Sequence, residues 1–403
     1  MASFVRDSKY RNILVSAGSR ETCYEQLRTV NSATSEGCNL AANSKFLAYT
    51  DASGGGSALA VLPLSSVGKN HIPITSTAYQ QPLIRGHSAA VSDFTFNPFN
   101  EHIVTSCSVD GSVNTWEIPH GGYISDCTSA KSSFNVVNSP LGLYYHPCIS
   151  DILTVRSKSS INIYNNERSE EIFSYNCAAD SYSMSWAPNT SNLMAVTCKN
   201  KNMYLVDTRL ASTSTSSGTG ICVSGHQGNR ASRVSFLGEY NSNYIVSTGH
   251  GKNNQDRELC LWDIRQCTSD TNSGAVNTTR LDTSTGVLMP FFDYDTNLLV
   301  LLGKGDASVR VFEVDTVVNT TSETESVNGI HPIINTVPTG CNASTDITRG
   351  AAILPKQCND LMKCEVLKIL RLHENNIQQV NMKVTRKETT KFHADLYPPT
   401  ITL

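Results

Sequence analysis

The stretch that decides the fold is RGHSAAVSDFTFNPFNEHIVTSCSVDGSVNTWEIP, which runs from Arg85 to Pro119. It opens on a Gly-His pair and closes on a Trp-Glu pair, and polar turns separate three short β-rich runs between them. This pattern is typical of one blade of a β-propeller, a four-stranded antiparallel sheet with a tight turn before its third strand. Because a single blade cannot bury both of its faces, one blade predicts several.

Four side chains of this stretch predict a buried polar network. We expect His87 to hydrogen-bond Asp110 in the turn, while the indole N–H of Trp116 and the hydroxyl of Ser106 complete the set. A buried network of this kind must be satisfied throughout, and it then fixes the geometry of the blade. We therefore interpret these residues as structural rather than catalytic.

The same pattern recurs along the chain about every 40–55 residues. Markers comparable to Trp116 end further repeats near residues 164, 207, 263 and 313. The clearest second copy opens at His226 and ends at Trp262, and Asp256 precedes that tryptophan at the spacing that Asp110 keeps to Trp116. We predict the same structural network in this copy.

The length of 403 residues suits seven blades of about 40–50 residues each. We therefore predict an all-β, seven-bladed β-propeller as a single domain over residues 1–393, with 394–403 as the start of a C-terminal extension. Residues 38–64 hold apolar strands around a glycine-rich turn, and they could start the first blade or complete the last. We assign closure of the ring to residues 38–64 together with 327–393, since pairing N- and C-terminal strands removes open edges.

Composition and motifs argue against an enzyme or a metalloprotein. The 13 cysteines are scattered without a C-x-x-C pair, and no Cys/His cluster has the spacing of a zinc site. The chain shows no signature of a hydrolase, kinase or phosphate-binding loop. We expect no catalytic residue, metal or cofactor. The N-terminal residues do not have the pattern of a secretory signal, so we expect a cytoplasmic protein.

Charge is distributed unevenly along the chain, whose net charge is −3. Residues 1–28 carry five basic and three acidic side chains, and residues 349–393 carry nine basic and four acidic ones. If the ends meet on closure, they form one basic sector on an otherwise acidic disc. Such a sector would suit an acidic protein polymer, an anionic lipid surface or RNA.

Several blocks of this sequence resemble blocks of the coronins, and they occur in the same order as in that family. They are SKYRN at 8–12, with Asn12 where His is usual, CYEQLR at 23–28, the glycine-rich block at 43–68, the blade at 86–119, GVLMPFFDYDTNLLVLLGKGDASVRVFEV at 286–314, RGAAILPK at 349–356, KCEVLKILRLHE at 363–374 and DLYP at 395–398. The resemblance implies a WD-repeat propeller that binds filamentous actin at the cell cortex, without nucleic acid as a partner. The family's C-terminal coiled coil has no counterpart heptads here, so we expect this chain to be monomeric.

The resemblance also implies which residues contact actin. Arg28, at the end of CYEQLR, matches a basic residue that the family uses for this contact, and Lys9 and Arg11 lie in the matched SKYRN block. Lys356 and Lys363 are added on charge alone. An actin-nucleating complex and an anionic membrane stay open as further partners. The rival interpretation is a general WD-repeat scaffold that binds peptides or subunits of an actin-nucleating or trafficking complex. A propeller hydrolase is disfavoured, because no paired carboxylates can be placed at the central channel.

Overall fold

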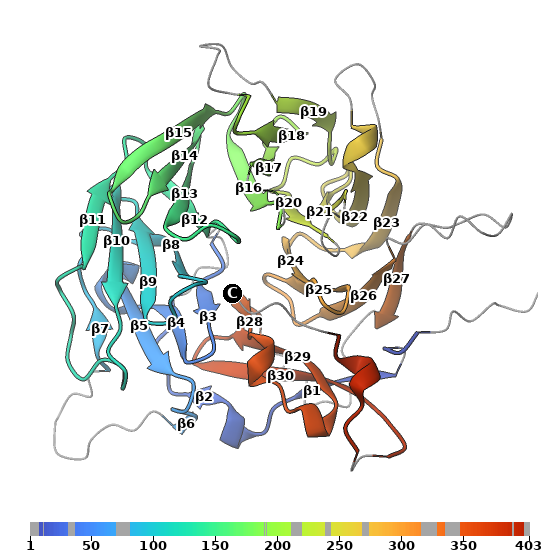
Figure 1. The fold of residues 1–403 in the computed structure, drawn as a ribbon, viewed down its shortest axis with the longest axis horizontal. Coiled ribbons are helices and arrows are strands. Elements are labelled where there is room, and N and C mark those ends of the chain that lie inside the picture. Colours follow the sequence, from blue (N-terminus) through green and yellow to red (C-terminus); the bar gives the residue numbers. More distant parts are fainter. Residues whose placement is uncertain are drawn as a thin grey trace, which may run out of the picture.

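The chain forms seven β-sheets arranged as blades around a central axis, as Figure 1 shows. The computed structural model describes residues 8–10, 12–30, 37–69, 81–188, 190, 192–210, 220–237, 243–267, 274–315, 329–334, 347–388 and 391–398. Within these residues, six sheets have four strands and the seventh has six. The predicted all-β, seven-bladed propeller is confirmed.

The blades are numbered in chain order, and each runs from the axis outwards. Blade 1 contains β3 (Leu40–Ala42), β4 (Phe46–Asp51), β5 (Ala58–Pro63) and β7 (Leu83–Ile84); blade 2 contains β8 (Val91–Phe96), β9 (Ile103–Ser108), β10 (Ser112–Glu117) and β11 (Ser132–Asn135); blade 3 contains β12 (Pro140–Tyr145), β13 (Ile152–Ser157), β14 (Ser160–Asn165) and β15 (Glu170–Asn176). Blade 4 contains β16 (Ser181–Trp186), β17 (Leu193–Cys198), β18 (Asn202–Asp207) and β19 (Gly220–Ser224); blade 5 contains β20 (Arg233–Phe236), β21 (Tyr244–His250), β22 (Asp256–Asp263) and β23 (Asn277–Thr283); blade 6 contains β24 (Leu288–Asp293), β25 (Leu298–Gly303), β26 (Val309–Asp315) and β27 (Gly329–Ile334). Blade 7 contains β28 (Gly350–Ile353), β29 (Glu365–Leu372), β30 (Asn376–Val384), β1 (Ile13–Ala17), β2 (Tyr24–Glu25) and β6 (Gly68–Lys69).

Short 3₁₀ turns connect some of these strands: η1 (Arg20–Thr22), η2 (Ser53–Gly56), η4 (Ile264–Gln266), η5 (Lys356–Cys358), η6 (Leu361–Lys363) and η7 (Ala394–Leu396). The glycine-rich turn between β4 and β5 needs its glycines, because Gly54 and Gly55 both have positive φ. Among the described residues, no helix has the length and apolar character needed to cross a bilayer.

Burial within a blade follows from its position between two neighbours. The second strand is covered on both faces, and β25, with the sequence LLVLLG, is buried at every residue. The outermost strand meets water, and β15, with the sequence EEIFSYN, is mostly exposed or half-buried. Continuous apolar runs therefore mark the second strands, and polar runs mark the outer ones.

The hydrophobic core is divided into clusters that lie between neighbouring blades. One cluster joins Val196 and Met184 of blade 4 to Ile161 of blade 3, and another joins Val300 of blade 6 to Val15 and Ile369 of blade 7. Equivalent clusters join the other neighbouring pairs around the ring. Each blade is thus stabilised chiefly by apolar contact with the next blade.

The ring closes differently from the prediction. Residues 38–64 do not pair with the C-terminal strands; they supply the three inner strands of blade 1. Closure comes from β1, where Ile13 pairs with Val384, and from β2, where Tyr24 pairs with Ile377. The prediction was wrong because 38–64 already forms most of a blade, whereas the free edge of β30 is covered by the two short strands β1 and β2. Residues 329–334 complete blade 6 rather than joining the closure.

The repeat markers identified in the sequence fall at equivalent structural positions. Trp116, Tyr164, Val206, Trp262 and Phe312 all lie on the third strand of their blades. Each repeat pattern therefore ends one strand before its blade does, and the fourth strand follows the marker. The division between the propeller and an extension at 394 stays a prediction, and within that segment Leu396 packs into the core of blade 7.

Candidate functional site

The polar network of blade 2 is centred on the hydroxyl of Ser106. His87 Nε2 lies 2.7 Å from this oxygen, and Trp116 Nε1 donates to it at 2.9 Å. All three side chains are buried. Burial lowers the pKa of His87, and the nearby charge of Asp110 opposes this effect only in part.

Asp110 does not make the predicted hydrogen bond to His87. Its carboxylate lies 3.8 Å from His87 Nδ1, while Ser112 Oγ lies between them, 2.8 Å from Nδ1 and 2.6 Å from Asp110 Oδ1. Asp110 also accepts from the backbone N–H and hydroxyl of Ser88. Burial acts to raise the pKa of Asp110, but these hydrogen bonds outweigh it and hold the pKa well below its ordinary value. Contrary to the prediction, Ser112 bridges His87 and Asp110 by hydrogen bonds to both.

Blade 5 repeats only the part of this network that joins histidine, serine and tryptophan. His226 Nε2 lies 2.9 Å from Ser247 Oγ, and Trp262 Nε1 donates to the same oxygen at 2.8 Å. Asp256 is not part of the network, contrary to the prediction, because its carboxylate accepts hydrogen bonds from Arg280, Asn253 and Thr283. The spacing to the tryptophan thus places Asp256 at the first residue of β22, beside the turn, but does not give its hydrogen-bond partners.

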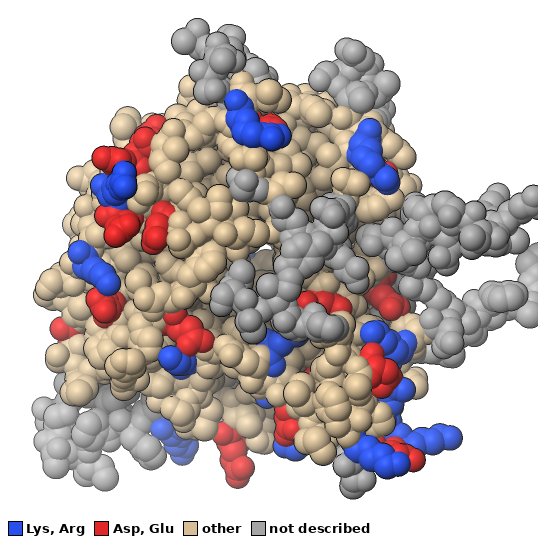
Figure 2. Space-filling view, in the orientation of Figure 1, with Lys and Arg blue, Asp and Glu red and all other residues tan. Residues whose placement is uncertain are grey.

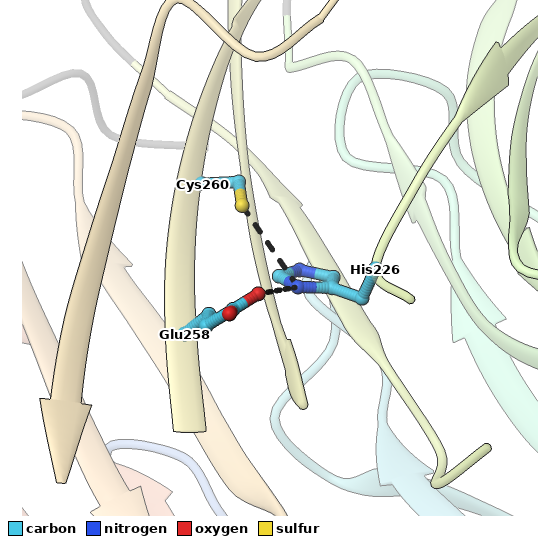
Figure 3. A group of neighbouring side chains, drawn as sticks. All are labelled: His226, Glu258 and Cys260. Carbon is cyan, nitrogen blue, oxygen red and sulfur yellow. Dashed lines mark hydrogen bonds and ion pairs between the residues drawn. The ribbon is translucent and has the colours of Figure 1, made fainter. Parts of the chain in front are cut away.

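Two side chains that the sequence analysis missed face the other nitrogen of His226. Glu258 Oε2 lies 3.7 Å from Nδ1 and Cys260 Sγ lies 3.8 Å from it, as Figure 3 shows. Burial would lower the pKa of His226, but the thiol of Cys260 and the carboxylate of Glu258 outweigh it and raise the pKa to about 9. A signal existed in the sequence, because these residues precede Trp262 by the intervals at which Ser112 and Asn114 precede Trp116.

Arg28 is exposed on a rigid part of the surface. Its guanidinium Nε lies 3.9 Å from Asp51 Oδ2, and over half of the arginine side chain is accessible whereas the aspartate is buried. The backbone beside it is held by both neighbouring blades: Ala52 N–H donates to Arg28 O, and Thr29 Oγ1 donates to the carbonyl of Glu374. Arg28 therefore lies at the junction of blades 1 and 7.

The other two candidates from the N-terminal block are Lys9 and Arg11. Lys9 is exposed, and its ammonium group donates to the carbonyl of Asp395 at 3.0 Å and lies over the ring of Tyr10. It borders a polar hollow of about 510 Å³ together with Arg386 and Glu313. Arg11 lies outside the described residues.

The two candidates chosen on charge alone are already paired with carboxylates. Lys356 is largely covered and bridges Asp293 at 2.8 Å and Asp295 at 3.1 Å. Lys363 is exposed and pairs with Asp360 at 2.9 Å. Lys363 therefore stays accessible to a partner, whereas Lys356 joins blade 7 to blade 6 through its ion pairs.

These candidates lie on two opposite faces of the disc. We call the side where second strands turn into third strands the upper face, and the side where first strands turn into second strands the lower face. Arg28 contacts the end of β4 and adjoins the turn between β29 and β30, so it lies on the upper face. Lys363 precedes β29, and Lys9 adjoins the far end of β30, so both lie on the lower face. The length of β30 separates the two groups by roughly 25 Å.

The chain ends do meet in blade 7, since β1 and β2 both pair with β30. On the face shown in Figure 2, however, blue basic and red acidic side chains of the described residues are interspersed, with the densest blue group at the lower right. The candidates therefore do not merge into one basic sector.

The blade architecture and the His–Ser–Trp networks define a WD-repeat propeller, and residues 79–117 match the family model described as "WD domain, G-beta repeat". Residues 3–69 match a second model, described as "Domain of unknown function (DUF1899)". Coronin-2A of Bos taurus is 30% identical over 405 residues, covering 98% of this chain and 70% of that protein, and Coronin-2A of Homo sapiens is 29% identical over the same share. The chain belongs to the coronin family.

A solved structure supports the same assignment. The crystal structure of the WD40 domain from Toxoplasma gondii coronin is similar to this chain with a TM-score of 0.79 and 26% identity. The match covers 97% of this chain and 91% of that one.

Proposed function

We propose that this coronin-family propeller binds filamentous actin through the upper face at the junction of blades 1 and 7, and that it acts as a binding protein on the cytoplasmic actin cytoskeleton. The observation that carries the proposal is the position of Arg28. It combines an accessible guanidinium with a backbone fixed from two blades. A preorganised cation of this kind loses little conformational entropy when an acidic surface docks on it.

The charge balance around Arg28 supports this role. Its counterion Asp51 is buried and lies 3.9 Å away, beyond the distance of a good hydrogen bond, so the guanidinium keeps donors for a partner. By contrast, Lys363 is closely paired with Asp360 and lies on the other face. The proposal therefore assigns the actin contact to the face of Arg28, and Lys9 and Lys363 become controls for it.

Co-sedimentation with actin filaments tests the proposal directly. Arg28→Asp should weaken pelleting strongly while leaving the circular dichroism spectrum and the melting temperature nearly unchanged. Lys363→Asp is the matched control, because it makes the same reversal of charge at an exposed residue on the opposite face. We expect this control to pellet like the parent protein.

Salt dependence provides a second readout. Binding through exposed charges weakens as ionic strength rises, because the Debye length falls to about 8 Å at physiological ionic strength and further above it. Normal pelleting of Arg28→Asp combined with loss for Lys363→Asp would move the site to the lower face. Normal pelleting of both would contradict actin binding through these basic residues.

A second candidate function is favoured by a groove on the lower face. Residues of blades 1, 2 and 7 line a hollow of about 730 Å³ whose apolar part is formed by Phe96, Pro98, Phe99 and Pro355. Phe99 is partly exposed there. Such a groove suits a peptide or a subunit of an actin-nucleating or trafficking complex, and Phe99→Ser should then abolish capture of that complex without changing actin pelleting.

A further inference from the structure

We propose that His226, Glu258 and Cys260 in blade 5 form a binding site for a divalent transition-metal ion, with Zn²⁺ as the best-suited ion. The three residues offer nitrogen, oxygen and sulfur, which is a donor set that zinc accepts readily. They form the one such group in the described part of the chain, and their donor atoms all lie within 4.8 Å of one another.

The separations between the donor atoms suit an ion placed among them. Nδ1 of His226 lies 3.8 Å from Cys260 Sγ and 3.7 Å from Glu258 Oε2. Around a tetrahedral zinc ion, with metal–ligand distances of about 2.0–2.3 Å, the donors stand about 3.3–3.6 Å apart. The two gaps to Nδ1 therefore need a contraction of about 0.2–0.4 Å to hold the ion, and the third pair of donors, Glu258 and Cys260, lies within 4.8 Å.

The strand and the loop around the site position these donors. Glu258 and Cys260 are two residues apart on β22, so both side chains project from the same face of the strand toward His226 (Figure 3). A Cβ atom at Gly249 would lie 2.3 Å from the His226 ring, and one at Gly251 would lie 2.6 Å from a Glu258 oxygen. Glycine at these two positions therefore leaves the space that the ring and the carboxylate occupy.

The hydrogen bonds on the far side of the imidazole prepare it for a metal. Ser247 Oγ lies 2.9 Å from Nε2 and also accepts from Trp262 Nε1. When an ion displaces the proton from Nδ1, the remaining ring proton stays on Nε2 beside Ser247, and the lone pair of Nδ1 then points toward the thiol and the carboxylate. Fixing of tautomer and orientation by an outer hydrogen bond is typical of metal-binding histidines.

Blade 2 supplies an internal comparison for this site. There the same positions carry Ser112 and Asn114, and Ser112 Oγ satisfies His87 Nδ1 directly at 2.8 Å. Neither a serine hydroxyl nor an asparagine amide is a good zinc ligand. The exchange of serine for glutamate and of asparagine for cysteine thus turns a hydrogen-bonding framework into a set of three ligands.

The site has a route to solvent. About a quarter of the Glu258 side chain is exposed, whereas His226 is almost fully covered. Three protein ligands leave one tetrahedral position for a water molecule. The ion would tie the loop carrying His226 to β22, so we expect binding to stabilise blade 5.

The test titrates metal-free protein with Zn²⁺ against a chromophoric chelator and measures the stoichiometry and the melting temperature. The matched variant is Glu258→Ser/Cys260→Asn, which reproduces the residues of blade 2. We expect one tight equivalent and a higher melting temperature for the parent, both lost in the variant, and no effect of Mg²⁺. The reciprocal variant Ser112→Glu/Asn114→Cys should gain an equivalent.

Two further measurements keep the result decisive if a variant fails to fold. Co²⁺ bound to the parent should show thiolate charge transfer and the strong visible bands of tetrahedral coordination. Ser247→Ala, which leaves all three ligands in place, should weaken Zn²⁺ binding by about 10–100-fold. Absence of cobalt–thiolate absorption in the parent, or an unchanged equivalent in a folded Glu258→Ser/Cys260→Asn variant, would overturn the proposal, because the ion would then be held by other cysteines or not at all.

Discussion

Replacing Ser106 by alanine should remove one hydroxyl and leave two buried groups without their hydrogen-bond partner. The side chain of Ser106 is fully buried, and its oxygen is shared by His87 Nε2 at 2.7 Å and Trp116 Nε1 at 2.9 Å. Each buried polar group left unsatisfied costs about 1–3 kcal/mol. We therefore expect Ser106→Ala to lower the free energy of unfolding by roughly 2–6 kcal/mol.

This loss converts into a measurable shift in melting temperature. An unfolding entropy of about 2.1 cal/mol/K per residue gives roughly 0.85 kcal/mol/K for a chain of this length, so the expected decrease is about 2–7 °C. Thermal unfolding followed by circular dichroism measures it. Ser150→Ala is the matched control, since this serine is exposed in the turn before β13 and undergoes the same chemical change.

The outcome separates a structural network from a binding site. We expect folded Ser106→Ala to pellet with actin as the parent does. A melting temperature equal to that of Ser150→Ala would refute the hydrogen-bond argument, and loss of pelleting at unchanged stability would show that the network belongs to the binding surface.

Three further predictions follow from packing, charge and closure. Gly86→Ala should lower the melting temperature, because a Cβ atom there would lie 2.2 Å from the Trp116 ring and overpacking costs about 1–3 kcal/mol. Burial acts to raise the pKa of Asp282, but hydrogen bonds from Arg257 and Arg310 outweigh it and keep the pKa low. The ionised carboxylate therefore stabilises the fold above the ordinary aspartate pKa of about 3.9, and this contribution is lost as pH falls below that value. Asp282→Asn should consequently flatten the acid side of a profile of urea midpoint against pH. Light scattering should find this chain monomeric at micromolar concentration, and a stable dimer would contradict that expectation.

The repeat pattern made most of the fold predictable from the sequence. Apolar second strands and tryptophan-like markers recur in phase because every blade meets the same two environments, a neighbour on each face and water at its rim. The strand pairing that closes the ring was harder to predict from the sequence. The sequence ILVSA at β1 is a short half-buried run, and nothing in it indicates that its partner is the strand from Asn376 to Val384. Such long-range pairing depends on which edge remains free after the other blades have formed.

The hydrogen-bond partners within the blades were predictable only in part. Spacing located His87, Ser106 and Trp116, because these positions are set by strand register. It could not show that Ser112 rather than Asp110 would hydrogen-bond the histidine, since that depends on side-chain direction and on the difference between a distance of 2.8 Å and one of 3.8 Å. In blade 5 the same limitation concealed Glu258, because its interval to Trp262 matches that of Ser112 to Trp116 but does not show that a carboxylate there would face the histidine.

The segment that closes the ring also carries the proposed actin contact. Arg28 follows β2 by three residues, and its backbone is held to blade 7 through Thr29 and to blade 1 through Ala52. The position of the guanidinium therefore depends on the same strand pairing that removes the open edge of β30. Substitutions in β1 or β2 that loosen closure would displace Arg28 as well as destabilise the propeller. Only a change confined to the exposed guanidinium separates the two effects, and this is why the charge reversal at Arg28 must be read together with its melting temperature.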